Sequence, residues 1–106
     1  MLPKKNRADK KTVERVFQEG KFINSLNLSF KFIKSGAKPR ISVIVPKNVS
    51  KLAVKRNRLR RLGYTVLAKQ LKDSPLRSTG VLIFKKYQDD PLVLEDEIKN
   101  IFNKMR

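Results

Sequence analysis

Apolar and polar residues alternate over 27–34, and a period of two is typical of a strand with one buried face. The apolar side of this strand comprises Leu28, Phe30 and Phe32, and the polar side includes Ser29 and Lys31. Residues 40–45 are rich in β-branched side chains and predict a second strand. Turn-forming residues at 35–39 separate the two strands, and so short a connection suggests a hairpin.

Helical spacing predicts a short helix near the N-terminus. Asp9 would cap a helix over 10–19, and Gly20 would follow it as the C′ residue. Its buried stripe is expected to comprise Val13, Val16 and Phe17, at positions i, i+3 and i+4. Two further strands are predicted, at Phe22 with Ile23 and over 81–87.

Two longer helices are predicted in the second half of the chain. Ser50 would cap a helix over 51–71, and Asp90 with Pro91 would begin the last one. The apolar face of the last helix comprises Leu94, Ile98, Ile101, Phe102 and Met105. The order of elements is therefore α-β-β-β-α-β-α, which predicts a single-domain α+β sandwich over residues 1–106.

Charge narrows the choice of partner. The 106 residues include 26 Lys and Arg against nine Asp and Glu, a formal net charge of +17. Small domains kept in solution by surface charge normally have a net charge of about 2–8. Nucleic acid is therefore the expected partner, with an anionic membrane surface as the lesser alternative. The last helix carries Glu95, Asp96 and Glu97 near its start, where the macrodipole favours acids, so it is expected to pack the core.

The composition excludes several kinds of chemistry. The chain has no Cys and no His, which removes thiol chemistry, the common zinc sites and nucleophiles activated by histidine. No apolar run is long enough to span a membrane and no secretory signal is visible, so a cytoplasmic protein is expected. A protein-only nuclease would need clustered carboxylates, and the acids here are scattered. We expect no catalytic residue, no metal ligand and no small-molecule substrate.

The predicted middle helix has two distinct faces. At about 100° per residue, its sheet-facing stripe is expected to comprise Leu52, Leu59, Leu62 and Val66. A second face is expected to comprise Asn57, Arg60, Arg61 and Tyr64, with Arg56 at its border. Guanidinium groups bind phosphate through paired donors, and Asn adds both a donor and an acceptor. No acid lies three or four residues from these arginines, which favours an RNA-binding surface over a merely solvated helix face.

This helix and the residues before it resemble the protein subunit of bacterial ribonuclease P. The matching residues are Val45, Pro46, Lys47, Ala53, Arg56, Asn57, Arg58, Arg60 and Arg61. Near the N-terminus, Asn6 and Arg7 precede a helix that ends Val16-Phe17-x-x-Gly20, as in that family. The resemblance implies a mixed sheet and places the arginine-rich helix in a left-handed βαβ crossover, an exception to the usual handedness.

The resemblance also implies a function, that of an accessory subunit of an endoribonuclease. In the family, a catalytic RNA with bound Mg²⁺ removes the 5′ leader of precursor tRNA, and the protein binds both RNAs. Carried over by position, the RNA-contacting residues would be Lys47, Lys51, Lys55, Arg56, Asn57, Arg58, Arg60 and Arg61. The leader cleft would include Phe17, Ser29 and Lys31, although Phe17 could equally be a core residue.

Two positions depart from the family pattern. Tyr64, preceded by Gly63, stands where an Arg is usual, and Lys31 stands where the cleft strand often carries Tyr. Glycine within a helix costs about 0.5–1 kcal/mol relative to alanine, so a close approach is expected at Gly63. Leader binding is expected to depend more on charge than on stacking. The alternative that the charge leaves open is a ribosomal or other structural RNA-binding protein.

Overall fold

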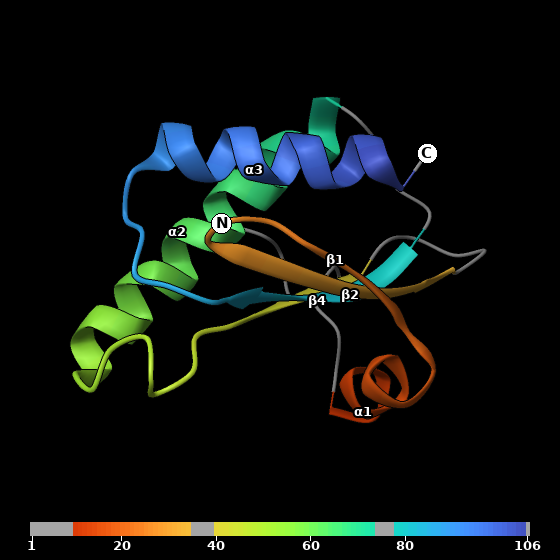
Figure 1. Cartoon of the computed structure of the whole chain (residues 1–106), viewed down its shortest axis with the longest axis horizontal. Helices are drawn as coiled ribbons and strands as arrows, with labels where there is room; N and C mark the ends of the chain where they lie inside the picture. Colours follow the sequence, from red (N-terminus) through yellow and green to blue (C-terminus); the bar gives the residue numbers. More distant parts are fainter. Residues whose placement is uncertain (1–9, 35–39, 74–77, 106) are drawn as a thin grey trace.

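The structure is a computed structural model, and it describes residues 10–34, 40–73 and 78–105. Within these ranges the order of elements confirms the predicted α-β-β-β-α-β-α arrangement (Figure 1). The elements are α1 (Lys10–Glu19), β1 (Lys21–Asn24), β2 (Leu28–Lys34), β3 (Arg40–Ile44), α2 (Ala53–Asp73), β4 (Ser78–Phe84) and α3 (Pro91–Lys104). The predicted cap Asp9 and the turn at 35–39 lie outside the described residues.

The four strands form one mixed sheet in the order β1-β2-β4-β3. β2 pairs antiparallel with β1 and with β4, whereas β3 pairs parallel with β4. The hairpin predicted between 27–34 and 40–45 is therefore wrong, because β4 lies between those two strands. β4 is buried on both faces, from Ser78 to Phe84 except for half-buried Ile83, and a strand of that kind belongs in the middle of a sheet.

Helices cover both faces of the sheet. α2 and α3 lie against one face and α1 against the other (Figure 1). The larger part of the core lies between the sheet and the helices α2 and α3. There the ring centroids of Phe30 and Phe102 are 5.9 Å apart. On the opposite face α1 contributes Val16, which is fully buried, against β2 and β4. The β3-α2-β4 connection thus spans a parallel strand pair, as expected of a βαβ unit.

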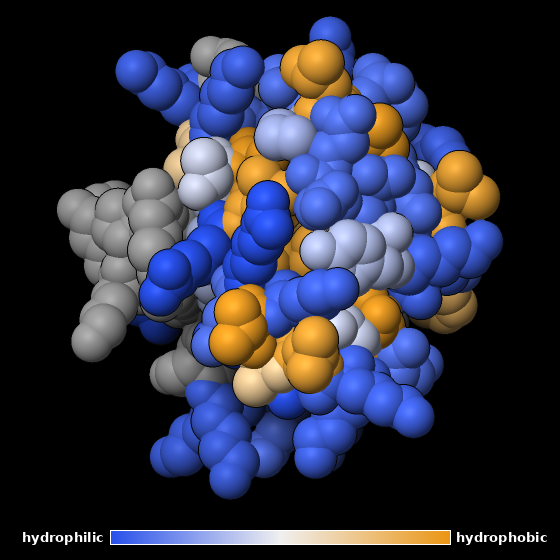
Figure 2. Space-filling view, turned by 90° about the vertical axis from the view of Figure 1, so that its left-hand side faces the viewer, coloured by the Kyte–Doolittle hydropathy of each residue, from blue (hydrophilic) through white to orange (hydrophobic). Residues whose placement is uncertain are grey.

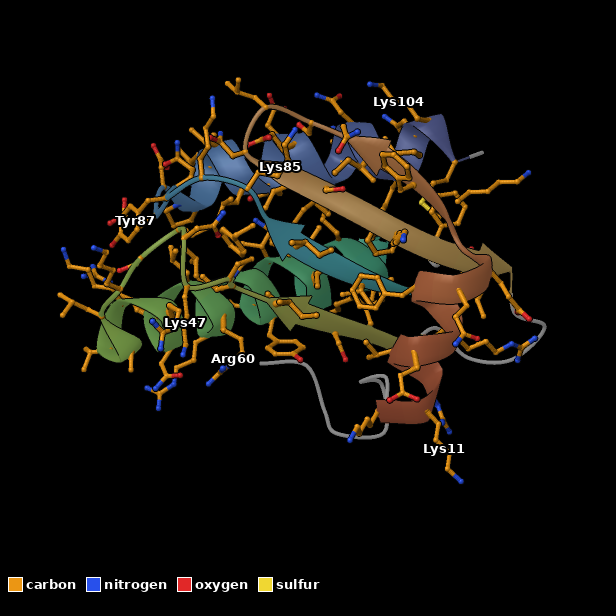
Figure 3. The ribbon with its side chains drawn as sticks, turned by 60° about the horizontal axis from the view of Figure 1, so that its bottom comes forward. Lys11, Lys47, Arg60, Lys85, Tyr87 and Lys104 are labelled. Atoms are coloured by element: carbon orange, nitrogen blue, oxygen red, sulfur yellow. The ribbon has the colours of Figure 1, made fainter. Side chains whose placement is uncertain are left out.

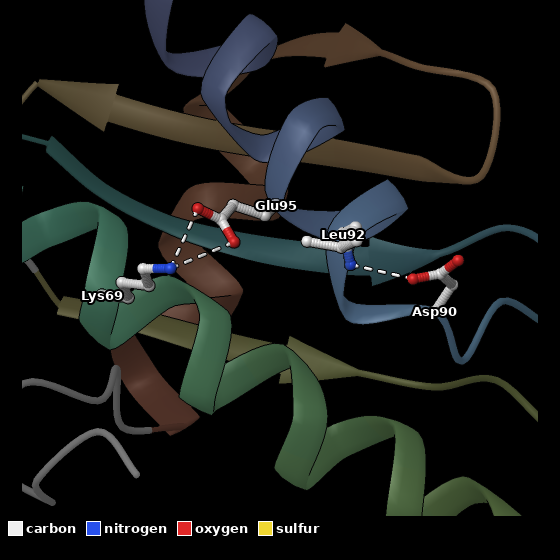
Figure 4. A network of polar contacts seen from close by, with 4 residues as sticks. All are labelled: Lys69, Asp90, Leu92 and Glu95. Atoms are coloured by element: carbon white, nitrogen blue, oxygen red, sulfur yellow. Dashed lines mark hydrogen bonds and ion pairs between the residues drawn. The ribbon is translucent and has the colours of Figure 1, made fainter.

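The last helix begins and packs as its sequence predicts. The backbone N–H of Leu92 donates a hydrogen bond to Oδ1 of Asp90 at 3.0 Å, and Pro91 occupies the first turn (Figure 4). All predicted apolar residues of α3 lie in or against the core, with Met105 half-buried at the C-cap. α3 thus serves as the packing element that was expected.

The acids of α3 act differently from the prediction, because none of them lies in the first turn, where the macrodipole is felt. Glu95 instead forms an ion pair with Lys69 of α2, at 3.2 Å (Figure 4). Glu97 is buried and accepts hydrogen bonds from Oγ of Ser25 at 2.6 Å and from the backbone N–H and Nδ2 of Asn27, each at 2.8 Å. Glu95 and Glu97 are therefore held by side-chain bonds to other elements and not by the helix dipole.

Burial by itself would raise the pKa of Glu97. The hydrogen bonds from Ser25 and Asn27, together with the positive charge of Lys85, more than offset burial and hold the pKa below its ordinary value. The carboxylate is therefore ionised at neutral pH, and its hydrogen bonds join the connection between β1 and β2 to α3.

Several predicted boundaries are shifted. α2 begins at Ala53 and not at 51, so Ser50 is not its N-cap, and α2 ends at Asp73. β4 covers 78–84 instead of 81–87. Gly20 follows α1 as predicted, but it does not adopt the left-handed conformation of a typical C′ glycine. Its lack of a side chain is needed for another reason, since a Cβ there would clash with the carbonyl oxygen of Val16.

Candidate RNA interface

The first turns of α2 extend past the sheet (Figure 1). Residues 53–58 are exposed except for half-buried Arg56, and full burial along α2 begins at Leu59. Leu52 was predicted to face the sheet, but 59% of it is exposed. Leu59 and Val66 do pack in the core, as predicted. The start of α2 therefore projects beyond the sheet with its positively charged side chains exposed, and only the later turns of the helix pack against the sheet.

Tyr64 does not belong to the exposed face on which the helical spacing placed it. Only 7% of Tyr64 is exposed, and its hydroxyl oxygen accepts a hydrogen bond from the backbone N–H of Val43 at 3.2 Å. The close approach expected at Gly63 is confirmed, because a Cβ at that position would lie 3.0 Å from Cγ1 of Val43. Both residues therefore dock α2 onto β3 and are not available to RNA.

The arginines of α2 point in two directions. Nη1 of Arg56 donates to the backbone oxygens of Ser50 and Lys51, at 2.9 and 3.0 Å. Nη2 of Arg60 donates to Oδ1 of Asn57. At about 100° per residue, Arg58 lies roughly opposite Arg56 and Arg60, whereas Arg61 lies between them on the side of Asn57. Both Arg58 and Arg61 are exposed. The predicted surface is thus not a single stripe but surrounds much of the helix. We call Arg56, Arg58, Arg60 and Arg61 together the α2 sleeve.

Arg56 keeps capacity for RNA despite its local bonds. A guanidinium group carries five N–H donors, and the two bonds to the loop carbonyls use only Nη1. Those bonds close the loop before α2 and fix the direction of the side chain. Asn57 fixes Arg60 in the same way, which limits the conformational entropy that phosphate binding would cost.

No carboxylate neutralises these arginines within the described ranges. The ion pairs found there join Arg15 to Glu19, at 3.1 Å, and Lys69 to Glu95, at 3.2 Å. Figure 2 shows the face towards which the start of α2 projects, where hydrophilic side chains predominate and a few apolar ones lie among them. The positive field of α2 therefore remains available to an anion.

A second basic segment, which the sequence interpretation missed, lies next to the start of α2. Lys85, Lys86 and Tyr87 follow β4 and are exposed. Nζ of Lys55 lies 5.8 Å from the centre of the Tyr87 ring, a cation–π contact. Figure 3 shows Lys47, Arg60 and Tyr87 at the same end of the molecule. Two adjacent lysines followed by an aromatic residue are a sequence pattern that suits RNA binding, but the sequence analysis assigned them to the strand predicted over 81–87.

The residues predicted for the leader cleft come together on the face of the sheet that α1 covers. Nζ of Lys31 donates to the backbone oxygen of Phe17 at 3.1 Å and lies 5.0 Å from the centre of its ring. Ser29 lies two residues from Lys31 on the same side of β2 and is half-buried. Phe17 is 41% exposed, so its prediction as part of the buried stripe of α1 is wrong. Val16 fills that role, with Val13 half-buried beside it.

Neither a metal site nor a membrane span is found within residues 10–34, 40–73 and 78–105. No three of their acidic side chains lie close enough together to hold a metal ion. No helix in those ranges is both long and apolar enough to cross a membrane.

Comparison with known proteins identifies the family. The family model described as Ribonuclease P matches residues 2–106. This chain belongs to the ribonuclease P protein family. The ribonuclease P protein component of Pseudanabaena sp. (strain PCC 6903) is 35% identical over 115 residues, covering 100% of this chain and 96% of the relative. The resemblance drawn from the arginine-rich helix is thereby confirmed, and the family places the chain among subunits of a tRNA-processing endoribonuclease.

Solved structures of ribonuclease P proteins share the fold. The protein from Thermotoga maritima superposes with a TM-score of 0.81 at 19% identity, covering 94% of this chain and 97% of that one. The protein from Staphylococcus aureus gives a TM-score of 0.75 at 18% identity, covering 98% and 92%. At such identities the comparison confirms the α+β fold class and carries no residue assignments.

Proposed function

We propose that this chain is the accessory protein of a ribonuclease P holoenzyme that removes the 5′ leader of precursor tRNA. The observation that carries the proposal is the exposed start of α2, whose arginines have no carboxylate partner in the described part of a ribonuclease P family member. In this proposal the catalytic RNA binds the α2 sleeve, and the leader binds the face formed by Phe17, Ser29 and Lys31.

The α2 sleeve suits a folded RNA. Arg58 and Arg61 would meet phosphates on the outer side of the helix, and Arg56 and Arg60 would meet phosphates beside the sheet. Lys47, Lys51 and Lys55 add point charges around the same end of the molecule. Because the arginine fork binds phosphate bidentately, this arrangement orients the RNA as well as attracting it.

The leader surface suits a single strand. The exposed ring of Phe17 offers a base a stacking partner, and Lys31 next to it offers a phosphate a counter-charge. The hydroxyl group of half-buried Ser29 could donate or accept a hydrogen bond. None of these contacts requires a particular base, as expected of a protein that serves many precursor tRNAs.

Catalysis is assigned to the RNA partner, which would also hold Mg²⁺. The described residues fit this division of labour, because their acids are dispersed and three of them do not converge on one point. The role of the chain is then to reduce repulsion among the phosphates of leader, tRNA and catalytic RNA. Binding by charge of this kind is steeply dependent on salt.

Reconstitution tests the first part of the proposal. The protein is added to a ribonuclease P RNA at low Mg²⁺, and cleavage of precursor tRNA is measured. Arg58→Ser and Arg61→Ser should each weaken assembly by about tenfold or more, and together by about a hundredfold or more, since hydrogen bonds to charged groups contribute about 1.5–3 kcal/mol each. The control is Lys99→Ser with Lys104→Ser, which removes the same charge from the exposed side of α3. Equal effects of the two pairs would contradict a specific surface on α2.

The leader surface needs a separate test. Phe17→Ala should weaken the binding of precursor tRNA to the holoenzyme by about 5-fold to 150-fold, the range for loss of one base–aromatic stack. Mature tRNA, which has no leader, should bind unchanged. An equal loss for both tRNAs would mean that the ring only supports the fold.

A further inference from the structure

The face of the sheet that carries Lys31 continues onto the edge strand β1. Phe22 and Lys31 are direct partners in the antiparallel pairing of β1 with β2, as are Asn24 and Ser29. Side chains of direct partners point to the same side of a sheet, with Cβ atoms about 4.5–5.5 Å apart. Since Lys31 contacts Phe17 of α1, Phe22 and Asn24 lie on the side of α1 as well.

The side chain of Phe22 is not part of the hydrophobic core. It is 58% exposed, whereas its neighbour Ile23, on the other side of the strand, packs against the core. β1 is an outer strand of the sheet, so no described strand covers its far edge. Phe17, which is 41% exposed, lies on the same face, so two aromatic rings accompany Lys31 there and offer stacking surface to the bases of a single strand.

We propose that Phe22 is a second stacking platform, which extends the leader surface from α1 to the outer edge of the sheet. The proposal rests on the proposed function, because it assigns one further leader nucleotide to a face already assigned to the leader. Lys31 then lies between two exposed rings, Phe17 from α1 and Phe22 from β1. Two bases would stack on the rings, and the ammonium group would meet a phosphate of the strand that joins them.

The chemistry of this row favours a single-stranded nucleic acid over an apolar partner. Phe17, Lys31 and Phe22 alternate between aromatic and cationic side chains. Asn24 and Ser29 form the next pair on the same side of β1 and β2 and add an amide and a hydroxyl group. Rings and cations in alternation match the bases and phosphates of an extended strand, and each base offers a π-face whatever its identity. In this proposal two rings contribute to leader binding beside the charge of Lys31.

The test measures binding of precursor tRNA by the reconstituted holoenzyme with Phe22 variants. Phe22→Ala and Phe22→Leu should each weaken binding by about 5-fold to 150-fold, whereas Phe22→Tyr, which keeps the ring, should bind as the parent does. Leu92→Ala is the control, because Leu92 is 75% exposed on α3, away from this face. The melting temperature should change little in all four variants, since neither side chain is buried.

Leader length makes the result specific. In a series of precursors shortened from the 5′ end, the effects of Phe17→Ala and Phe22→Ala should disappear at different leader lengths, because the two rings would contact different nucleotides. Equal weakening of mature tRNA, or full retention of affinity by Phe22→Ala, would overturn the proposal. If Phe17→Ala is leader-dependent and Phe22→Ala is not, only the second platform is refuted. If neither variant depends on the leader, the leader surface itself is wrong.

Discussion

The hydroxyl oxygen of Tyr64 accepts a hydrogen bond from the backbone N–H of Val43, at 3.2 Å, and so joins α2 to the outer strand β3. The bond lies one helical turn after Arg60, on the same side of α2. On this side of α2 the exposed arginines therefore end at Arg60, and Tyr64, one turn later, contacts the sheet. Removal of this bond should affect the fold and leave the RNA surface intact.

Tyr64→Phe should lower the free energy of unfolding by about 1–3 kcal/mol, because the buried N–H of Val43 loses this acceptor. Tyr87→Phe is the matched control, since Tyr87 is exposed and its change should leave stability nearly unaltered. Denaturant unfolding gives both values. Weaker RNA binding by Tyr64→Phe without a loss of stability would instead return Tyr64 to the RNA surface.

Gly63→Ala should destabilise the protein although alanine is the better helix former. The added methyl group would lie 3.0 Å from Cγ1 of Val43 and 3.3 Å from Cε1 of Phe84. Overpacking of that kind costs about 1–3 kcal/mol, more than the gain of about 0.5–1 kcal/mol from helix propensity. Val43→Ala in the same chain should relieve part of the clash, so a double-mutant cycle should show coupling between the two sites. Additive effects would show that Gly63 has room for a side chain.

The sequence predicted the elements whose signals are local. Asp90 and Pro91 mark the start of α3 by their own chemistry, and the helical period of its apolar residues marks the buried face. The alternation in β2 likewise predicted that Ser29 and Lys31 lie on the side opposite Phe30. Such patterns report which side of an element is buried, and burial is what the fold must satisfy first.

Pairing and docking could not be predicted in the same way, because they depend on distant residues. The short connection between β2 and β3 allowed a hairpin. In the structure β4, which is buried on both faces, lies between β2 and β3 instead. Helical spacing correctly grouped Arg60 with Tyr64, but it could not show that α2 passes from solvent onto the sheet between them. The bonds of Glu97 to Asn27, 70 positions apart, leave no pattern in the sequence.

The buried carboxylate of Glu97 should make stability depend on pH. Its pKa is lower in the folded protein than the ordinary glutamate value of 4.5 that applies to the unfolded chain. The stabilisation is therefore fully present above that value and is lost as the pH falls through the folded pKa. Glu97→Gln should cost about 1–3 kcal/mol at neutral pH, and the difference from the parent should shrink in acid.

A second substitution of the same kind nearby separates this effect from general acid destabilisation. Glu95→Gln removes an ion pair whose lysine is mostly exposed, so it should cost less than about 1 kcal/mol. Unfolding curves measured between neutral and acidic pH compare the two variants. If the cost of Glu97→Gln were the same at every pH, the bonds to Ser25 and Asn27 would not depend on the charge of the carboxylate.

The two directions of the α2 arginines should separate RNA binding from stability. Arg58→Ser and Arg61→Ser should each make the salt dependence of RNA binding less steep, by about 0.7–0.9 in the logarithmic slope for each phosphate that is no longer neutralised. Neither change should alter the unfolding free energy, because neither guanidinium group bonds to a carboxylate of the described chain. Arg56→Ser should weaken RNA binding and also destabilise the protein by about 1 kcal/mol, because the carbonyls of Ser50 and Lys51 lose their shared donor.

Lys104→Ser provides the baseline for this comparison, since it removes one positive charge from the exposed end of α3. A general effect of net charge would lower the slope equally in this variant and in Arg58→Ser, because long-range attraction depends on total charge and not on position. Contact with phosphate gives a different result, since only a side chain at the interface displaces counterions. Equal slopes in all four variants would therefore remove α2 from the interface, whereas a change confined to the α2 variants would place the RNA along that helix.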